Sequence, residues 1–281
     1  DDLKIKRKPH VLLTTPESLD VLLFRKDASL STVSAVVIDE VHLLYNTQRG
    51  LQLSILLRRL ESRTENSIQF AMQSATAGRL EDVVTFLLGD AGQADLLFFP
   101  PERSIDAQVR RIRCEEDFLT LMTRLVAGRR SKLLVFTDSR RECERLSDIL
   151  RLNGSLANHV YLQYSSLAPE VRVETERLFA EAQTAICIAT PTLELGIDIG
   201  DIDAVVLWGP PASVESFLQR IGRGNRRSTK ANVICLISDR SVNDTIDALR
   251  FAVLIASTKA GDLPVRGPYE LYGAVAQQIL G

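Results

Sequence analysis

Residues 35–42 read Ala35-Val36-Val37-Ile38-Asp39-Glu40-Val41-His42, an apolar run that ends in two adjacent carboxylates. A short apolar run of this kind predicts a buried strand of a parallel sheet. In open sheets with helices on both faces, ligands bind at the carboxyl ends of the strands. The stretch therefore predicts a fold class and also the edge of the sheet at which polar chemistry would lie.

Similar apolar runs alternate with amphipathic helical runs along almost the whole chain. The expected strands are 11–14, 35–39, 68–72, 133–137, 160–164, 185–190, 204–208 and 233–237, and the expected helices include 51–63, 79–88, 140–152, 214–221 and about 242–257. Strands separated by helices indicate parallel sheets covered on both faces. The sequence predicts an α/β fold.

The domain organisation follows from a break at Pro100-Pro101, where a polar segment leads into a new set of strand–helix units. We expect a first domain over 1–102 and a second over 103–260. Residues 261–281 are expected to be a Gly/Pro-bearing connector and the first helix of a further domain.

Composition restricts the class of protein. The 281 residues carry a formal net charge of -2, with 45% apolar and 25% charged residues, which is ordinary for a globular protein. Basic residues nevertheless cluster at 4–8, 110–113, 129–132 and 220–230, and such clusters are either solvated surface or part of a nucleic-acid track.

The remaining composition argues against a secreted or membrane protein. The four cysteines form no CxxC pair, which favours reduced thiols and an intracellular, cytoplasmic location over disulfides or a zinc site. No apolar run is as long as a membrane span, and no signal peptide opens the chain, so no membrane partner is expected.

Asp39 and Glu40 suit two tasks at the end of their strand. One carboxylate can hold Mg²⁺, directly or through water, while the other orients and deprotonates a water molecule. The alternative is a strand that simply ends in a charged turn. Ser74 and Thr76 follow the next strand, where their hydroxyls could bond to this edge or cap the following helix.

Two further motifs lie in the second half of the chain. Residues 219–227, Gln-Arg-Ile-Gly-Arg-Gly-Asn-Arg-Arg, combine four arginines with two glycines, which suits a phosphate clamp or a basic loop on nucleic acid. Residues 189–200 run from a strand into a turn that starts at Thr190 and reaches Gly196-Ile197-Asp198. Thr190 suits a nucleic-acid phosphate, and Asp198 suits a ribose hydroxyl or one of the arginines.

The order of these motifs resembles that of the superfamily 2 DExH-box helicases, over nearly the whole chain. Thr15–Leu19 looks like motif Ib of that superfamily, and Val135–Arg140 like motif IV. The residues within these motifs are most similar to those of the large helicase-related (Lhr-type) group, in which a winged-helix domain follows. The segments that carry this closer resemblance are Thr14–Leu19, Arg49-Gly50, Leu193–Asp201 and Pro268–Leu280.

The resemblance implies two RecA-like domains, the first incomplete at its N-terminus, and an ATP- and Mg²⁺-dependent motor. Asp39 would hold the metal through water, and Glu40 would be the general base. His42 and Gln219 would relay the nucleotide state across the domains, and Ser74 and Thr76 would couple hydrolysis to closure. The arginine fingers would be Arg223 and Arg226, and the nucleotide-binding turn would contain Gly196 and Asp198.

The same resemblance implies a nucleic-acid partner, either single-stranded DNA or an RNA–DNA hybrid. Its phosphates would be gripped by Thr15, Pro16 and Glu17 on the first domain and by Ser139, Arg140 and Thr190 on the second. The sequence departs from the family at Gln163–Leu167, which replaces His-His-Gly-Ser-Leu, at Pro191 and at Asn225. Arg226 and Arg227 compete for the last finger position.

The chain contains no G-x-x-x-x-G-K-[ST] phosphate-binding loop. We expect that the sequence starts part-way through the first domain, upstream of which the loop would lie, so that the chain alone would hydrolyse little ATP. The alternative is a non-enzymatic nucleic-acid-binding or scaffold protein with a degenerate helicase fold. A translocase that moves on duplex without separating its strands is a third reading.

Overall fold

The computed structural model describes residues 9–74, 80–89, 94–97, 104–127, 131–191, 201–224, 230–238 and 244–260. The described residues up to 97 form one compact unit, and those from 104 to 260 form another. The expected segment 261–281 lies outside the described residues, and the expected boundary at 102 stays a prediction. Among the described helices, none has both the length and the apolar composition needed to cross a bilayer.

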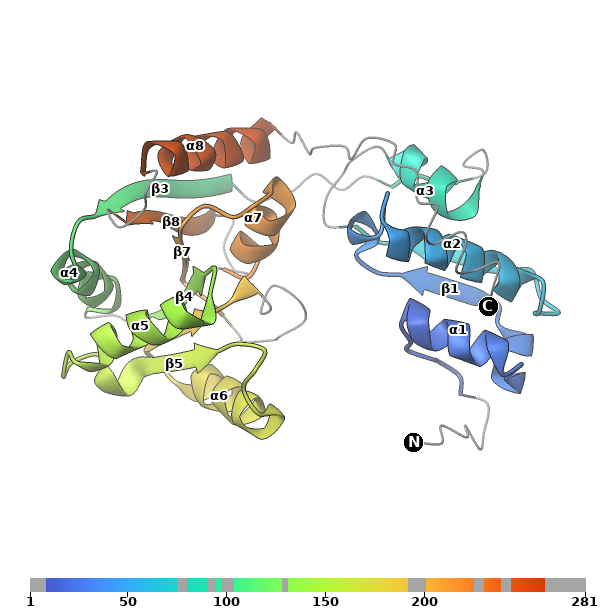
Figure 1. Cartoon of the computed structure of the whole chain (residues 1–281), viewed down its shortest axis with the longest axis horizontal. Helices are drawn as coiled ribbons and strands as arrows, with labels where there is room; N and C mark the ends of the chain where they lie inside the picture. Colours follow the sequence, from blue (N-terminus) through green and yellow to red (C-terminus); the bar gives the residue numbers. More distant parts are fainter. Residues whose placement is uncertain are drawn as a thin grey trace. The chain divides into compact units, whose positions relative to one another are not determined.

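The first unit contains two parallel strands, β1 (Ala35–Ile38) and β2 (Gln69–Met72), with Ala35 opposite Gln69. The helices of this unit, shown in Figure 1, are α1 (Pro16–Phe24), α2 (Gln48–Glu61) and α3 (Leu80–Leu88), with 3₁₀ turns at Ala28–Thr32 and Val41–Leu43. The sequence begins α1 and α2 in the same way, because Thr15 and Thr47 each accept a hydrogen bond from a backbone N–H three residues on.

Two apolar clusters hold the first unit together through neighbouring parts of one apolar stripe of α2. Leu53 and Leu57 pack with Ile38 of β1 and with Val83 and Leu87 of α3. Along the same stripe α2 also packs against α1 and the first 3₁₀ turn, through a cluster of Leu19, Leu23, Leu30, Leu56 and Leu60. The helix therefore fixes β1, α1 and α3 relative to one another.

The second unit is built on six parallel strands in the order β3-β8-β7-β4-β6-β5. In chain order the strands are β3 (Ser104–Ile112), β4 (Lys132–Thr137), β5 (Val160–Gln163), β6 (Ala185–Ala189), β7 (Ala204–Trp208) and β8 (Lys230–Ser238). Central strands are buried along their whole length, as in β6, where all five residues are buried. This matches the continuous apolar runs of the sequence.

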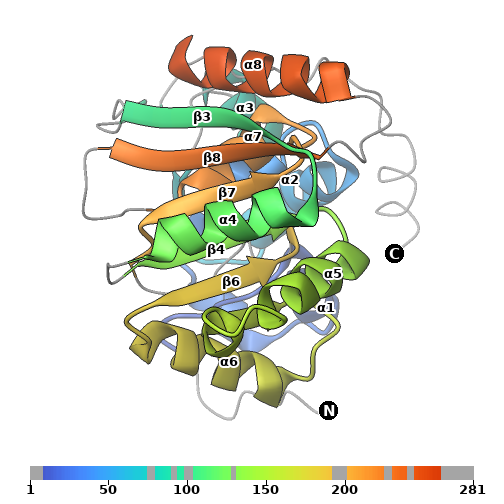
Figure 2. The same cartoon turned by 90° about the vertical axis from the view of Figure 1, so that its left-hand side faces the viewer.

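Helices cover both faces of this sheet because successive side chains of each strand point to opposite sides. Leu133 and Val135 pack beneath α4 (Glu115–Val126) and α5 (Arg140–Arg151), the pair turned toward the viewer in Figure 2. Leu134 and Phe136 enter the other core, which the remaining helices cover. Those helices are α6 (Pro169–Glu181), α7 (Val214–Ile221) and α8 (Asp244–Ala260), and a 3₁₀ turn at Ala157–His159 precedes β5.

The structure confirms the α/β class and most of the expected elements. The strand expected at 11–14 is wrong: these residues form no strand, and Leu13 is 93% exposed, so nothing stabilises an extended pairing there. Strand β3 was not expected from the sequence, because its nine residues are mostly exposed and polar. An edge strand of this kind carries little of the apolar pattern that identifies a buried one.

Gly50 in the first turn of α2 offers a test of the packing of the first unit. A Cβ at this position would overlap the carbonyl oxygen of Leu44, whereas one at Gly154 would meet nothing within 4 Å. We expect Gly50→Ala to lower the free energy of unfolding by about 1–3 kcal/mol, as overpacking does. Chemical denaturation of the two alanine variants measures this, and equal effects of Gly50→Ala and Gly154→Ala would contradict it.

Candidate functional site

The carboxyl edge of β1 and β2 is held by hydrogen bonds that continue beyond the strands. Gln73 N–H donates to the Ile38 carbonyl at 2.9 Å, and Val41 N–H donates to the Gln73 carbonyl at 2.9 Å. The two turns that follow the strands are thereby tied together. As a result, the residues after Ile38 and those after Gln73 lie at one place.

Three of the expected site residues meet at this edge. His42 Nδ1 lies 3.1 Å from the Ser74 hydroxyl and 3.5 Å from Glu40 Oε2. Glu40 Oε2 is buried and accepts no hydrogen bond from the described residues. A carboxylate oxygen with unused lone pairs next to an imidazole is chemically suited to take a proton from a bound water.

The backbone of Glu40 is in the left-handed conformation, with φ 49° and ψ 41°. This conformation costs a non-glycine residue about 1–3 kcal/mol and is concentrated at functional sites. Two contacts hold it: Glu40 N–H donates to Asp39 Oδ1 at 2.9 Å, and the next N–H is bound to Gln73. The turn separates the two neighbouring carboxylates, so that Asp39 is exposed while one Glu40 oxygen is buried.

The donor set at this edge fits Mg²⁺ better than a metal held by protein ligands alone. Within the described residues, no three His, Cys, Asp or Glu side chains gather as a metal site. Mg²⁺ keeps several waters and usually takes only one or two carboxylates, with phosphate oxygens completing the shell. Asp39, exposed and oriented by the Glu40 N–H, can supply such a carboxylate.

The residues expected to grip nucleic acid in the first unit have unequal chemistry. Thr15 caps α1 through its hydroxyl, and Pro16 has no N–H to offer. Glu17 forms a two-pronged ion pair with Arg49, with Nε–Oε1 at 2.8 Å and Nη2–Oε2 at 3.2 Å. This bond lowers the pKa of Glu17 to about 2. Arg49 is a cation beside motif Ib to which the sequence analysis gave no role.

In the second unit, the expected residues lie after two neighbouring strands, β4 and β6, at the carboxyl edge of the sheet. Ser139 caps α5 by accepting from the Glu142 N–H at 3.2 Å. Arg140 is the first residue of α5 and its Nε donates to Glu144 Oε1 at 2.9 Å. Thr190 follows β6, is only 8% exposed, and its N–H donates to the Gln163 carbonyl at 3.2 Å. The structure thus places these three residues on one edge.

Helix α7 carries Gln219 and a buried arginine that the sequence analysis did not single out. Arg220 is 3% exposed, donates to Asp138 Oδ1 at 3.3 Å and lies over the Phe136 ring at 5.6 Å. Position 220 lies three residues after Phe217, on the helix face that packs into the core, and that spacing was the available signal. Arg220 therefore connects α7 to the end of β4.

Arg223 follows α7 in a turn, where its N–H donates to the Arg220 carbonyl at 3.2 Å. Four expected site residues, Thr76, Gly196, Asp198 and Arg226, lie outside the described residues. The same holds for Asn225 and Arg227. Of the two expected finger residues, the structure therefore describes Arg223 and not Arg226.

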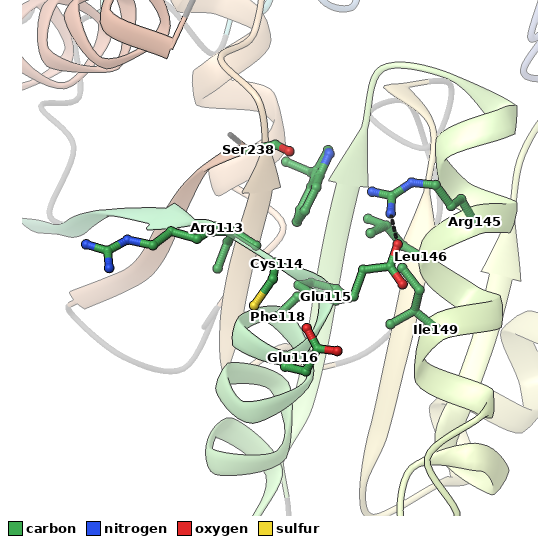
Figure 3. Close-up of a pocket in the computed structure, with 11 residues that line it drawn as sticks. Arg113, Cys114, Glu115, Glu116, Phe118, Arg145, Leu146, Ile149 and Ser238 are labelled. Atoms are coloured by element: carbon green, nitrogen blue, oxygen red, sulfur yellow. Dashed lines mark hydrogen bonds and ion pairs between the residues drawn. The ribbon is translucent and has the colours of Figure 1, made fainter. Parts of the chain in front are cut away.

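A pocket of about 330 Å³ opens between α4 and α5 at the same edge of the second unit, and none of the expected site residues lines it. Figure 3 shows Arg145 reaching Glu115 across it, at 3.1 Å. Arg145 also binds Glu142 and lies over the Trp208 ring at 5.6 Å. Of the charged side chains that line this pocket, Arg145 and Glu115 are paired with each other.

The Glu17–Arg49 pair should make stability depend on acid. The folded-state pKa of Glu17, about 2, lies below the ordinary value of 4.5. Its contribution is therefore fully present above about pH 4.5 and is lost as the pH falls through about 2. Because both side chains are about half exposed, the effect is at most about 1 kcal/mol and weakens in salt.

Denaturant titrations of the wild type and Glu17→Gln between about pH 6 and pH 2 check this. The two free energies of unfolding should differ at the upper end and converge at the lower end. Curves that stay parallel throughout would show that the pair does not stabilise the fold.

The Arg220–Asp138 contact should contribute more to the free energy of unfolding than the Glu17–Arg49 pair does, because the Arg220 guanidinium is buried. We expect Asp138→Ala to cost about 1.5–3 kcal/mol of unfolding free energy, the range for hydrogen bonds to charged groups. Asp148, an exposed carboxylate on α5, is the matched control and its alanine variant should stay within about 0.5 kcal/mol of wild type. Equal effects of the two substitutions, measured by chemical denaturation, would refute the stabilising role.

Comparison with known proteins agrees with the motif order. The family model described as DEAD/DEAH box helicase matches residues 1–83, and that of the helicase conserved C-terminal domain matches residues 116–228. ATP-dependent helicase Lhr-Core of Methanocaldococcus jannaschii is 34% identical over 99% of the chain and 33% of its own length. Lhr-Core protein 2 of Thermococcus barophilus is 32% identical over 99% of the chain and 34% of its length.

The solved structure of Mycobacterium smegmatis helicase Lhr bound to ssDNA and AMP-PNP superposes with a TM-score of 0.80, at 29% identity, over 98% of the chain and 37% of that protein. The chain thus spans about a third of the length of the curated relatives it matches. With both helicase domain models matched in order and Lhr proteins aligned along nearly its whole length, the chain belongs to the superfamily 2 helicases of the Lhr type.

Proposed function

We propose that the chain is the motor core of an ATP-dependent helicase or translocase that acts on single-stranded DNA or on an RNA–DNA hybrid. The observation that carries the proposal is the convergence of Glu40, His42 and Ser74 at one strand edge, with Asp39 exposed beside them. The Asp39–His42 segment and Ser74, which are successive motifs in the helicase order, are thereby in contact through their side chains. A charged turn that simply ended the strand would not require a buried carboxylate oxygen that accepts no hydrogen bond from the described residues.

In this proposal Glu40 accepts the proton of the attacking water, and His42 responds to the charge on Glu40 through Nδ1. Ser74, bonded to the same ring nitrogen, passes that state to the segment that follows β2, with Thr76 in the same coupling role. Asp39 would hold Mg²⁺, and the ion would supply charge neutralisation at the phosphates of ATP. Gly196 and Asp198 would bind the nucleotide.

The second unit would complete the reaction. Gln219 would relay the nucleotide state together with His42. Arg223 and Arg226 would act as arginine fingers. Fingers of this kind are worth about 10³–10⁵ in rate where they are established. The buried Arg220 supports this assignment indirectly, because it fixes the helix from which Gln219 and the Arg223 turn extend.

For nucleic acid we propose phosphate contacts by Thr15, Ser139, Arg140 and Thr190. The geometry supports a changed role for Glu17 and Pro16: an anion and a residue without an N–H are poor phosphate ligands. Glu17 instead orients Arg49, and Pro16 fixes the start of α1, whose N-terminus attracts anions. The solved Lhr relative binds ssDNA, which favours single-stranded DNA as the first substrate to test.

A non-hydrolysing nucleic-acid-binding or scaffold protein is the second candidate, and one observation favours it. The 281 residues contain no G-x-x-x-x-G-K-[ST] loop, whose backbone amides and lysine normally hold the β- and γ-phosphates. We accordingly propose that these 281 residues alone hydrolyse little ATP.

Three buried cysteines, Cys143, Cys187 and Cys235, fit a reducing compartment, and we propose a cytoplasmic location.

Glu40→Gln in the full-length protein separates the two candidates. The motor predicts ATP hydrolysis that single-stranded DNA stimulates and that falls by at least about a hundredfold on loss of the general base, with DNA binding retained. Glu61→Gln, which removes an exposed carboxylate from the same unit, is the control and should leave the rate unchanged. Wild-type protein that binds DNA without stimulated hydrolysis would decide for the scaffold.

A further inference from the structure

Arg140 sits in a cluster whose members come from two elements of the second unit. Its Nε donates to Glu144 Oε1 at 2.9 Å, one turn along α5. The ring of Tyr164, just after β5, lies 5.1 Å from Arg140 Cζ, and the Tyr164 hydroxyl donates to the same Glu144 oxygen at 3.0 Å. Ser166 Oγ lies 3.5 Å from Arg140 Nη1, at the limit of a hydrogen bond.

The cluster leaves one part of the guanidinium available. The Nε–H is bound to Glu144, and the Tyr164 ring covers one face. The Arg140 side chain is nevertheless 60% exposed. The two terminal nitrogens therefore present the fork of N–H groups that binds a phosphate through two hydrogen bonds.

The protonation states of the cluster are fixed at neutral pH. The hydrogen bond from Arg140 lowers the pKa of Glu144, and the same bond raises the pKa of Arg140. Burial raises the pKa of the Tyr164 phenol, so it remains a donor. The arrangement is thus a constant feature of the unit and not a switch.

We infer that Tyr164 and Glu144 are positioning residues that hold the Arg140 fork for one phosphodiester of a bound strand, an inference that rests on the proposed function. Tyr164 is 9% exposed beneath Arg140, so its ring supports the arginine and is not a platform for a base. The contact therefore reads the backbone and carries no sequence preference. This gives a task to a tyrosine at a position where the sequence departs from the family pattern.

Substitution of Glu144 distinguishes this inference from the simpler explanation that the site attracts phosphate only by its net charge. If the site only attracted phosphate by its charge, Glu144→Ala would tighten binding, because it removes a negative group beside the strand. If Glu144 orients the fork, the same variant weakens binding. The two explanations predict changes of opposite sign.

The test is fluorescence anisotropy of the full-length protein with labelled oligo-dT and oligo-dA. We expect Arg140→Ala to weaken binding about tenfold and to reduce the salt slope by about one. Tyr164→Ala and Glu144→Ala should each weaken it about three- to tenfold, equally for both oligonucleotides. Tyr164→Phe, which keeps the ring, should stay within about twofold of wild type.

A double-mutant cycle separates positioning from general damage to the fold. In the Arg140→Ala background, Tyr164→Ala and Glu144→Ala should have no further effect on affinity. The control is Arg177→Ala on α6, which removes another exposed arginine paired with helical carboxylates but without a stacked ring. It should change affinity by less than about twofold.

Tighter binding by Glu144→Ala, or a Tyr164→Ala loss that persists without Arg140, would overturn the inference while leaving the proposed function intact. If Tyr164→Ala does not fold, Glu144→Ala and Tyr164→Phe decide alone, because both keep the buried ring. Wild-type protein that binds neither oligonucleotide would overturn the proposed nucleic-acid function, and the inference with it.

Discussion

Parallel pairing of neighbouring strands is the constraint on which both candidate sites depend. It brings the carboxyl ends of strands that are distant in sequence to one edge, where each chain leaves the sheet in a polar turn. In the first unit the pairing extends one step past the strands, through the Gln73 and Val41 hydrogen bonds. That extension, together with the hydrogen bond from Glu40 N–H to Asp39 Oδ1, holds Glu40 in its left-handed conformation, and it brings Ser74 beside His42.

The arginines of the second unit show how position on a helix decides what an arginine does. Arg220 lies on the core face of α7 and connects two elements from inside. Arg140 lies at the exposed start of α5, where a carboxylate and a ring hold it from below. Arg145, one and a half turns further along α5, is bound by two carboxylates over a tryptophan. The same side chain thus serves packing at Arg220 and internal charge balance at Arg145, and in our proposal it contacts an anion at Arg140.

The sequence sufficed for the fold class and for the strand that ends at Asp39, because buried parallel strands are continuous apolar runs. It failed at 11–14, an apolar run without a described partner strand. It also failed at β3, a mostly polar strand that is held by its hydrogen bonds to β8 and not by an apolar pattern of its own. Glu40, His42 and Ser74, which the motif order assigned to one motor, lie together in the structure, and their roles stay predictions. It could not show that Glu17 is engaged by Arg49 or that Arg140 rests on Tyr164, because both contacts depend on tertiary packing.

The position of β3 also bears on how the second unit is made. Its first strand pairs along its full length with β8, the last strand, while β4 to β7 form the remainder of the sheet. A chain emerging from the ribosome at about 5–20 residues per second must therefore carry β3 unpaired until the end of the domain has been synthesised. The exposed, arginine-bearing composition of β3 suits that interval, since charged edges resist pairing with other nascent chains.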